Sequence, residues 1–307
     1  MHMRKKTAFI TGADGFIGHE LVLNLLKENY DICVFLAEDS VALEEVNCEV
    51  LYCNMCNYES FILKDKQLLE KFKDSVFFHL AWQGSAGSLR TDYKIQLDNV
   101  KCTCDAVRLA KRLGARRFVG IGSIMEDECN FCVPNDGFTP IPTFQYSIAK
   151  YSAHLMAKTV ANETQIEFVW GKISNAYGAS DKTNRFINNL IQRLIKGEDF
   201  DLSTCEQNYD FIYVSEVARA LRLIGENGKK NYSYYIGSGA AGPLKNFVEI
   251  VADRIKSKSK LNYGALKGGV VMLNINYFDS SKTRSHTGFE CNIDFESGID
   301  KTLQRIL

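Results

Sequence analysis

The chain has 307 residues, which is enough for one large α/β domain or two modest ones. Its 37 basic side chains are balanced by 37 acidic ones, so charge gives no reason to expect nucleic acid or an anionic membrane as the main partner. Residues 1–6 run directly into a strand-like segment, with no apolar signal region and no membrane span elsewhere. We therefore expect a soluble, cytoplasmic protein.

Ten cysteines include two CxxC pairs, Cys53/Cys56 and Cys129/Cys132. Four thiolates can hold zinc, but these pairs are far apart in the sequence and lack the glycine and aromatic pattern of a zinc knuckle. Reduced cysteine behaves as a small hydrophobe, so we expect free thiols and no metal. The five histidines form no ligand cluster, and His79 is expected to be structural.

Strand-like and helix-like segments alternate along the first half of the chain. Apolar, β-rich runs predict strands at residues 7–11, 32–36, 49–53, 75–81 and 117–121. Helical spacing of apolar side chains from Ile17 to Leu25 and over residues 97–113 predicts helices between them. This alternation predicts an α/β fold, a doubly wound parallel sheet with helices on both faces.

After about residue 170 the pattern is less regular. It predicts helices at 186–196, 215–225 and 244–255, and short strands at 211–214 and 232–236. We therefore expect a large N-terminal domain over residues 1–174 and a smaller C-terminal lobe over residues 175–307. The lobe should be discontinuous, with some segments returning to the sheet, and should pack over the carboxyl edge of the sheet.

The strongest local signal is a glycine-rich turn that follows the first strand and opens the first helix, the context of a dinucleotide-binding fingerprint. Gly12 permits the tight turn, Gly15 lets the backbone approach a pyrophosphate, and Gly18 lets the helix pack closely on the strand. The first-turn amides face the phosphates along the positive end of the helix dipole. The sequence therefore predicts NAD or NADP as cofactor, held by Gly12, Asp14, Gly15, Phe16, Ile17 and Gly18.

The spacing TGxxGFIG resembles the opening of extended short-chain dehydrogenases/reductases, the family of sugar-nucleotide epimerases, dehydratases and reductases. Further segments resemble the family's motifs in the family's order over nearly the whole chain: residues 78–81, Asn99, residues 173–178, residues 210–218 and residues 235–239. These motifs are specific for the superfamily and not for one substrate.

The resemblance implies a Rossmann domain with a substrate-binding C-terminal lobe. It implies cofactor contacts from Leu80, Ala81, Trp82 and Asn99. Trp82 either stacks near the nicotinamide or the sugar or packs in the core, and the sequence leaves both open. The family also implies a homodimer formed through the helices that carry Asn99 and Tyr146.

Tyr146 and Lys150 form a YxxxK pattern and project from the same face of a helix. A phenol that exchanges a proton near neutral pH needs its pKa of about 10 lowered by roughly three units. A neighbouring ammonium favours the phenolate and lowers this pKa. The resemblance adds Ser123 as the donor to the reacting oxygen, and assigns Lys150 a second role as ligand of the nicotinamide ribose.

The residues after Ser123 distinguish between reactions. Sugar-nucleotide 4,6-dehydratases carry an acid pair directly after the catalytic hydroxyl, whereas Ile124 and Met125 stand here. We therefore disfavour dehydration. The acidic residues 126–128 are interpreted as a solvated loop.

The cofactor and substrate sides depart from the family in several places. Leu36 stands at the acidic ribose-binding position, followed by Glu38 and Asp39, which oppose a 2′-phosphate and so favour NAD over NADP. Asn54 and Met55 are expected at the adenine. Tyr209 replaces the usual arginine, so Arg185 or Arg193 becomes the candidate for the substrate charge, unless either is an ordinary surface residue. By resemblance, Asn175 is a candidate sugar or phosphate contact.

The predicted function is hydride transfer to or from a nucleotide-linked sugar. The overall pattern resembles bacterial reductases of 4-keto-6-deoxy sugar nucleotides from surface-polysaccharide pathways. One alternative is a nucleotide-sugar 4-epimerase that retains its NAD, and another is a non-catalytic NAD(P)-binding sensor or scaffold.

Overall fold

The structure is a computed structural model that describes residues 5–40, 43, 46–132, 137, 139–183, 185–267 and 271–307, without the side chains of residues 131 and 132. Seven parallel strands form its main sheet: β1 (Thr7–Thr11), β2 (Asp31–Leu36), β3 (Glu49–Tyr52), β4 (Val76–His79), β5 (Arg117–Ser123), β6 (Glu167–Ile173) and β11 (Ser233–Ile236). The order is β11-β6-β5-β4-β1-β2-β3, so the direction of winding reverses between β1 and β4. The predicted doubly wound sheet is confirmed, and ligands of such sheets bind at the carboxyl ends of the strands beside this reversal.

Both faces of the sheet are buried, because alternate residues of each strand point to opposite sides. Ala8 and Ile10 of β1 pack in one core cluster with helices α1 (Phe16–Lys27) and α7 (Val214–Asn227). Phe9 packs in the other cluster with helices α3 (Tyr93–Arg112) and α5 (Phe144–Thr164). The short helices are α2 (Lys66–Lys71), α4 (Glu126–Cys132), α9 (Ser281–Thr287), η1 (Met55–Asn57), η2 (Ser88–Thr91) and η3 (Ile275–Phe278).

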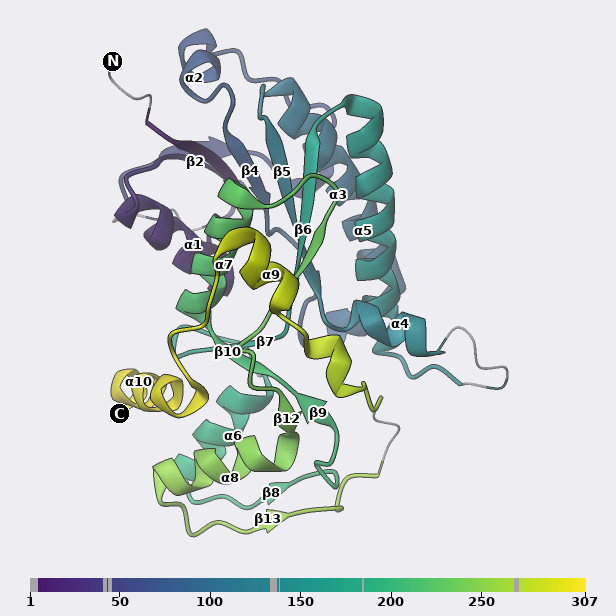
Figure 1. Cartoon of the computed structure of the whole chain (residues 1–307), viewed down its shortest axis with the longest axis vertical. Coiled ribbons are helices and arrows are strands. Elements are labelled where there is room, and N and C mark those ends of the chain that lie inside the picture. The colour runs from purple at the N-terminus through teal and green to yellow at the C-terminus, as the bar shows by residue number, and fades with distance from the viewer. Residues whose placement is uncertain are drawn as a thin grey trace.

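A third core cluster lies beyond the carboxyl edge of the sheet, in the lower part of Figure 1. It contains helices α6 (Phe186–Ile195), α8 (Leu244–Ile255) and α10 (Phe295–Ile306). Three short strand pairs accompany them: β7 (Asn175–Tyr177) with β10 (Phe211–Tyr213), β9 (Asn208–Tyr209) with β12 (Gly242–Pro243), and β8 (Phe200–Asp201) with β13 (Leu261–Asn262). β11 and α7 come from the same half of the sequence, yet they belong to the main sheet and its covering layer.

Helix α3 begins earlier than its apolar spacing predicts, at Tyr93 instead of residue 97. Asp92 explains the difference, because its side chain accepts hydrogen bonds from the amides of Lys94 and Ile95. Such an N-cap satisfies amides that have no partner within the helix.

Two further findings concern membranes and metals. No helix within the described ranges is both long enough and apolar enough to cross a membrane. All cysteines whose side chains the structure describes are free thiols, and no cluster of three or more His, Cys, Asp or Glu side chains suited to a metal is found among the described residues. The side chain of Cys132, in the second CxxC pair, lies outside that part of the chain.

Candidate functional site

A cavity of about 1450 Å³ lies at the carboxyl edge of the main sheet and is also lined by residues of β7, α6 and β10. Except for Arg193, the candidate site residues from the sequence all line it: Gly12, Asp14, Gly15, Phe16, Ile17, Gly18, Asn54, Met55, Leu80, Ala81, Trp82, Asn99, Ser123, Tyr146, Lys150, Asn175 and Arg185. Segments that are far apart in the sequence therefore meet at one site.

The glycine loop forms one wall of this cavity. Gly12 has a left-handed φ of 69°, and a Cβ there would lie 2.6 Å from the backbone nitrogen of Ala81. Only glycine satisfies both constraints without strain. Helix α1 begins after Gly15, which has no side chain to cap the first-turn amides, so these amides can bind an anion such as a pyrophosphate.

The loops after β2 and β3 line one end of the cavity, and the loop after β2 brings acidic side chains to it. Glu38 and Asp39 line it together with Asn54 and Met55, whereas the side chain of Leu36 is buried in the core. The side-chain oxygen of Asn54 accepts a hydrogen bond from the backbone nitrogen of Glu38 at 3.4 Å, which connects the two loops.

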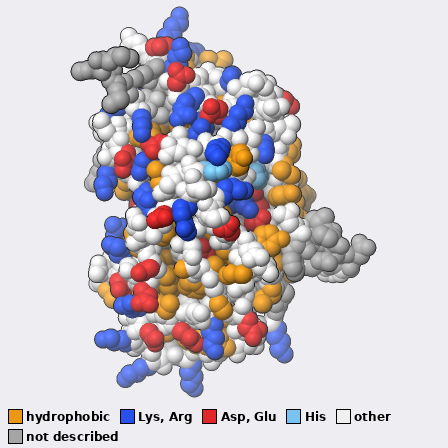
Figure 2. All heavy atoms as spheres, viewed as in Figure 1, with side chains coloured by type: hydrophobic (Ala, Val, Ile, Leu, Met, Phe, Trp, Pro, Cys, Tyr) orange, Lys and Arg blue, Asp and Glu red, His pale blue; other side chains and the backbone are white. Residues whose placement is uncertain are grey.

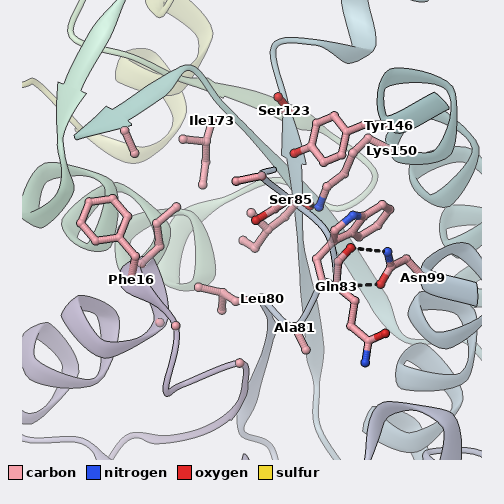
Figure 3. Close-up of a pocket in the computed structure, with 18 of the residues that line it drawn as sticks. Phe16, Leu80, Ala81, Gln83, Ser85, Asn99, Ser123, Tyr146, Lys150 and Ile173 are labelled. Atoms are coloured by element: carbon pink, nitrogen blue, oxygen red, sulfur yellow. Dashed lines mark hydrogen bonds between the residues drawn. The ribbon is translucent and has the colours of Figure 1, made fainter. Parts of the chain in front are cut away.

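The loop after β4 is held in place by a polar side chain from α3. Asn99 accepts a hydrogen bond from the backbone nitrogen of Gln83 at 2.9 Å and donates one to its carbonyl at 2.8 Å, as Figure 3 shows. Trp82, in the same loop, is half-buried and lines the cavity, and its indole donates to Gln96 at 3.1 Å. His79 lies deeper, between the hydroxyls of Thr11 and Thr103, and burial lowers its pKa to about 3.

Tyr146 and Lys150 project from α5 into the cavity next to Ser123 at the end of β5 (Figure 3). All three are buried, with 8%, 5% and 8% of their surface exposed. The Lys150 ammonium donates to the carbonyl of Ile121 at 2.9 Å and lies 3.6 Å from the ring of Trp82. Trp82 therefore contacts Lys150 directly, in a cation–π arrangement.

Burial is the largest cause of the pKa shifts of Tyr146 and Lys150, the two titratable site residues on α5. It raises the pKa of Tyr146, while Arg90, Arg185 and a hydrogen bond with Ser123 lower it. Burial also lowers the pKa of Lys150 to about 7, and the nearby Glu126 acts in the opposite direction. Lys150 lies 5.9 Å from the Tyr146 ring, so the cations that act most on this phenol are the two arginines.

Arg90 is a site residue that the sequence analysis missed. Its guanidinium lies 4.4 Å from the centre of the Tyr146 ring, and its Nε is buried with no hydrogen-bond partner among the described residues. Arg90 lies in η2, a short turn of the loop after β4, and no local pattern marks it.

The two arginines proposed from the sequence differ in their surroundings. Arg185, before α6, lines the cavity, where it donates to Ser85 at 3.4 Å and has its nearest acid, Asp181, at 4.0 Å. Arg193 instead pairs with Glu198 at 3.0 Å on the surface. Asn175 also lines the cavity, and its amide donates to the carbonyl of Asp210.

The interpretation of residues 126–128 as a solvated loop is wrong. They begin helix α4, and their exposed fractions are 1%, 6% and 8%. Each carboxylate has a partner from another element: Glu126 contacts Trp170 and His154, Asp127 pairs with Lys172 at 2.6 Å, and Glu128 accepts from Ser147 at 2.7 Å. Partners distant in the sequence make this burial possible.

Comparison with known proteins agrees with this geometry. The model of the NAD-dependent epimerase/dehydratase family matches residues 8–237. CDP-abequose synthase of Salmonella typhimurium is 26% identical over 317 residues, which cover 100% of both chains. A putative UDP-glucose 4-epimerase of Methanocaldococcus jannaschii is 26% identical over 305 residues, which cover 96% of each chain.

A solved structure shares the fold. UDP-glucose 4-epimerase of Thermus thermophilus, in complex with NAD, matches with a TM-score of 0.75 at 16% identity, over 97% of this chain and 98% of that one. The predicted family resemblance is confirmed, because the family model covers most of the chain. The protein is thus a member of the NAD-dependent epimerase/dehydratase family.

Proposed function

We propose that this enzyme transfers hydride between a nicotinamide cofactor and a carbon of a nucleotide-linked hexose. The observation that carries the proposal is the meeting of Ser123, Tyr146 and Lys150 in the same cavity as the glycine loop. This chemistry requires a hydroxyl, a phenol and an ammonium in one cavity with a loop that binds phosphate.

Each of these groups has a proposed role. The Tyr146 phenol exchanges a proton with the reacting oxygen of the sugar, and the Ser123 hydroxyl donates a hydrogen bond to the same oxygen. Lys150 binds the nicotinamide ribose, and the cations Arg90 and Arg185 favour the phenolate of Tyr146. Asn175 and Arg185 bind the substrate, since both line the cavity on the side of α6 and β7.

The described residues fit NAD. The loop at Gly12 and the amides at the start of α1 suit a pyrophosphate. Glu38 and Asp39 disfavour a 2′-phosphate at the ribose end, so we propose NAD in preference to NADP. When bound, NAD accepts or supplies the hydride, and Leu80, Ala81 and Trp82 line the wall beside it.

The proposed reaction is reduction of a 4-keto-6-deoxyhexose linked to a nucleotide, in surface-polysaccharide biosynthesis. Its support is the similarity to CDP-abequose synthase and the apolar residues Ile124 and Met125 where an acid pair would favour dehydration. The second candidate is a 4-epimerase that retains its NAD, supported by the similarity to UDP-glucose 4-epimerases.

Two measurements separate these candidates. The nucleotide released on denaturing the purified protein is identified and counted per chain, and the protein is then assayed with NADH and a panel of CDP- and dTDP-linked 4-keto sugars. A reductase releases little nucleotide and consumes NADH with a keto sugar. Near-stoichiometric bound NAD, together with interconversion of UDP-glucose and UDP-galactose, would instead establish the epimerase.

Tyr146→Phe tests whether the chain is catalytic at all. The variant should lose about 10²–10⁴-fold in kcat, because it removes the proton-exchanging group, and should bind NAD with nearly unchanged affinity. A variant with the same biological effect as the wild type would support the non-catalytic sensor or scaffold.

We also propose that the enzyme is a cytoplasmic homodimer, divided into a cofactor domain over residues 1–174 and a mainly substrate-binding lobe over 175–307. The proposed dimer face is formed by α3 and α5. Hydrophobic side chains gather along the α5 edge of the molecule, at the right of Figure 2. On the two helices Tyr93, Leu97, Ile148, Leu155 and Met156 are exposed.

A further inference from the structure

Glu126 contacts Ser123, the residue proposed to donate a hydrogen bond to the reacting oxygen of the sugar. It is the first residue of α4, three positions after Ser123, and only 1% of its surface is exposed. A carboxylate buried to this extent is costly unless each oxygen has a partner. Its partners therefore indicate what it holds in place.

Both carboxylate oxygens of Glu126 accept hydrogen bonds from other elements. One oxygen accepts from the backbone nitrogen of Ser123 at 2.9 Å and from the indole of Trp170 at 3.0 Å. The other is 3.0 Å from Nδ1 of His154, whose Nε2 is 2.8 Å from the hydroxyl of Ser233. This chain of contacts connects the end of β5 to α5, β6 and β11.

The sequence of β5 leaves room for this arrangement. A Cβ at Gly122 would lie 2.0 Å from a carboxylate oxygen of Glu126 and 2.1 Å from the indole nitrogen of Trp170. A Cβ at Gly120 would lie 2.2 Å from the Trp170 ring. His154 covers the other face of that ring, stacked at 4.9 Å with an interplanar angle of 3°. Glycine at positions 120 and 122 thus leaves the space that the Glu126 carboxylate and the Trp170 ring occupy beside the strand end.

Glu126 also acts electrostatically on Lys150. Burial lowers the pKa of Lys150 to about 7, Glu126 raises it, and Arg185 lowers it further. Of the other groups near Lys150, Tyr146 shares its helix, and His79 is buried with a pKa of about 3, so His79 carries no charge at neutral pH. Among the described residues, Glu126 is the acid whose charge favours the Lys150 ammonium.

We propose that Glu126 is a positioning residue of this site: its carboxylate fixes the backbone of Ser123, and its charge balances the buried Lys150 ammonium. The inference rests on the proposed function insofar as Ser123 and Lys150 are taken as groups of the reacting centre. It assigns a purpose to a buried acid that takes no direct part in the proposed chemistry.

Three variants distinguish the effect of the Glu126 hydrogen bonds from the effect of its charge. Glu126→Gln keeps an oxygen for Ser123 and Trp170 but removes the charge, and Glu126→Ala removes both. Asp127→Asn is the matched control, because Asp127 is also buried on α4 but pairs with Lys172, outside the cavity lining.

The charge is tested by competitive acetylation of the protein over a range of pH, with Lys150 followed by peptide mass spectrometry. The apparent pKa of Lys150 should fall by about one unit in Glu126→Gln, because an opposite charge is lost, and should not change in Asp127→Asn. In an activity assay, the limb of the pH profile that reports loss of the ammonium should move to lower pH in Glu126→Gln, with KM unchanged.

The hydrogen bonds are tested by amide hydrogen exchange of the Ser123 peptide. Exchange should accelerate by about tenfold or more in Glu126→Ala, and stay near the wild-type rate in Glu126→Gln and Asp127→Asn. Neither acetylation nor exchange needs a substrate, so failure to turn over any nucleotide sugar would sink the proposed function alone. Unchanged acetylation of Lys150 in Glu126→Gln, or equal exchange in all variants, would overturn the positioning role.

Discussion

Gly122→Ala tests the packing behind Ser123 through its effect on stability. The new Cβ would lie 2.0 Å from the Glu126 carboxylate and 2.1 Å from the Trp170 indole nitrogen, so one of the two must move. Overpacking of a dense core costs roughly 1–3 kcal/mol. Each buried donor that loses its acceptor, the Ser123 amide or the Trp170 indole, costs about 1–3 kcal/mol more. We therefore expect a loss of at least about 2 kcal/mol, a large part of the roughly 5–15 kcal/mol typical of a folded protein.

The assay is urea denaturation followed by circular dichroism. Gly242→Ala is the control, because a Cβ there meets nothing within 4 Å among the described residues. Its free energy of unfolding should stay within about 1 kcal/mol of the wild type. If Gly122→Ala changed stability as little as this control, the carboxylate and indole could not be held where the structure places them.

Four further predictions concern the cofactor, the assembly and pH. Gly12→Ala should weaken NAD binding by about tenfold or more in calorimetry, because the left-handed φ of 69° and the Ala81 backbone both exclude a Cβ; unchanged affinity would argue against the glycine loop as the cofactor site. Glu38→Arg should raise the affinity for NADP relative to NAD, measured by fluorescence titration, and an unchanged ratio would place the 2′-phosphate elsewhere. Leu97→Glu, on the exposed face of α3, should convert the proposed dimer to a monomer in sedimentation, whereas a monomeric wild type would refute the dimer itself. His79 stays unprotonated in the native state down to a pKa of about 3, while the unfolded chain binds that proton below its ordinary pKa, so stability should fall as pH is lowered. Between pH 7 and pH 5 this protonation should lower the free energy of unfolding by about 2 kcal/mol. Urea denaturation of His79→Gln should not show this fall.

The sheet was largely predictable from the sequence because its signals are local. The expected strand at 7–11 coincides with β1, and the helix at 244–255 with α8. β6 was not singled out, since Gly171 and Lys172 interrupt its apolar run. α4 was missed because its acidic first turn has the composition of a solvated loop.

The difference between local signals and long-range contacts also explains which parts of the site could be predicted. The glycine loop and the Tyr146/Lys150 pair are short-range motifs whose chemistry depends on spacing alone, and the structure brings them to one cavity. Arg90 lies against Tyr146 only because the loop after β4 folds back over α5. Glu126 is buried only because Trp170 and His154 arrive from β6 and α5. No local pattern contains these long-range contacts.

The path of the chain limits how the substrate range of this enzyme can change. After supplying β7 and α6 beyond the sheet edge, it returns to add α7 and the edge strand β11, and α9 then packs on β11, where Thr283 donates to the Tyr235 carbonyl at 2.6 Å. A cut after residue 174 would remove an edge strand and expose one face of the core. Exchanging residues 175–307 as one cassette would therefore disrupt the main sheet, whereas substitutions in the cavity wall leave the sheet intact.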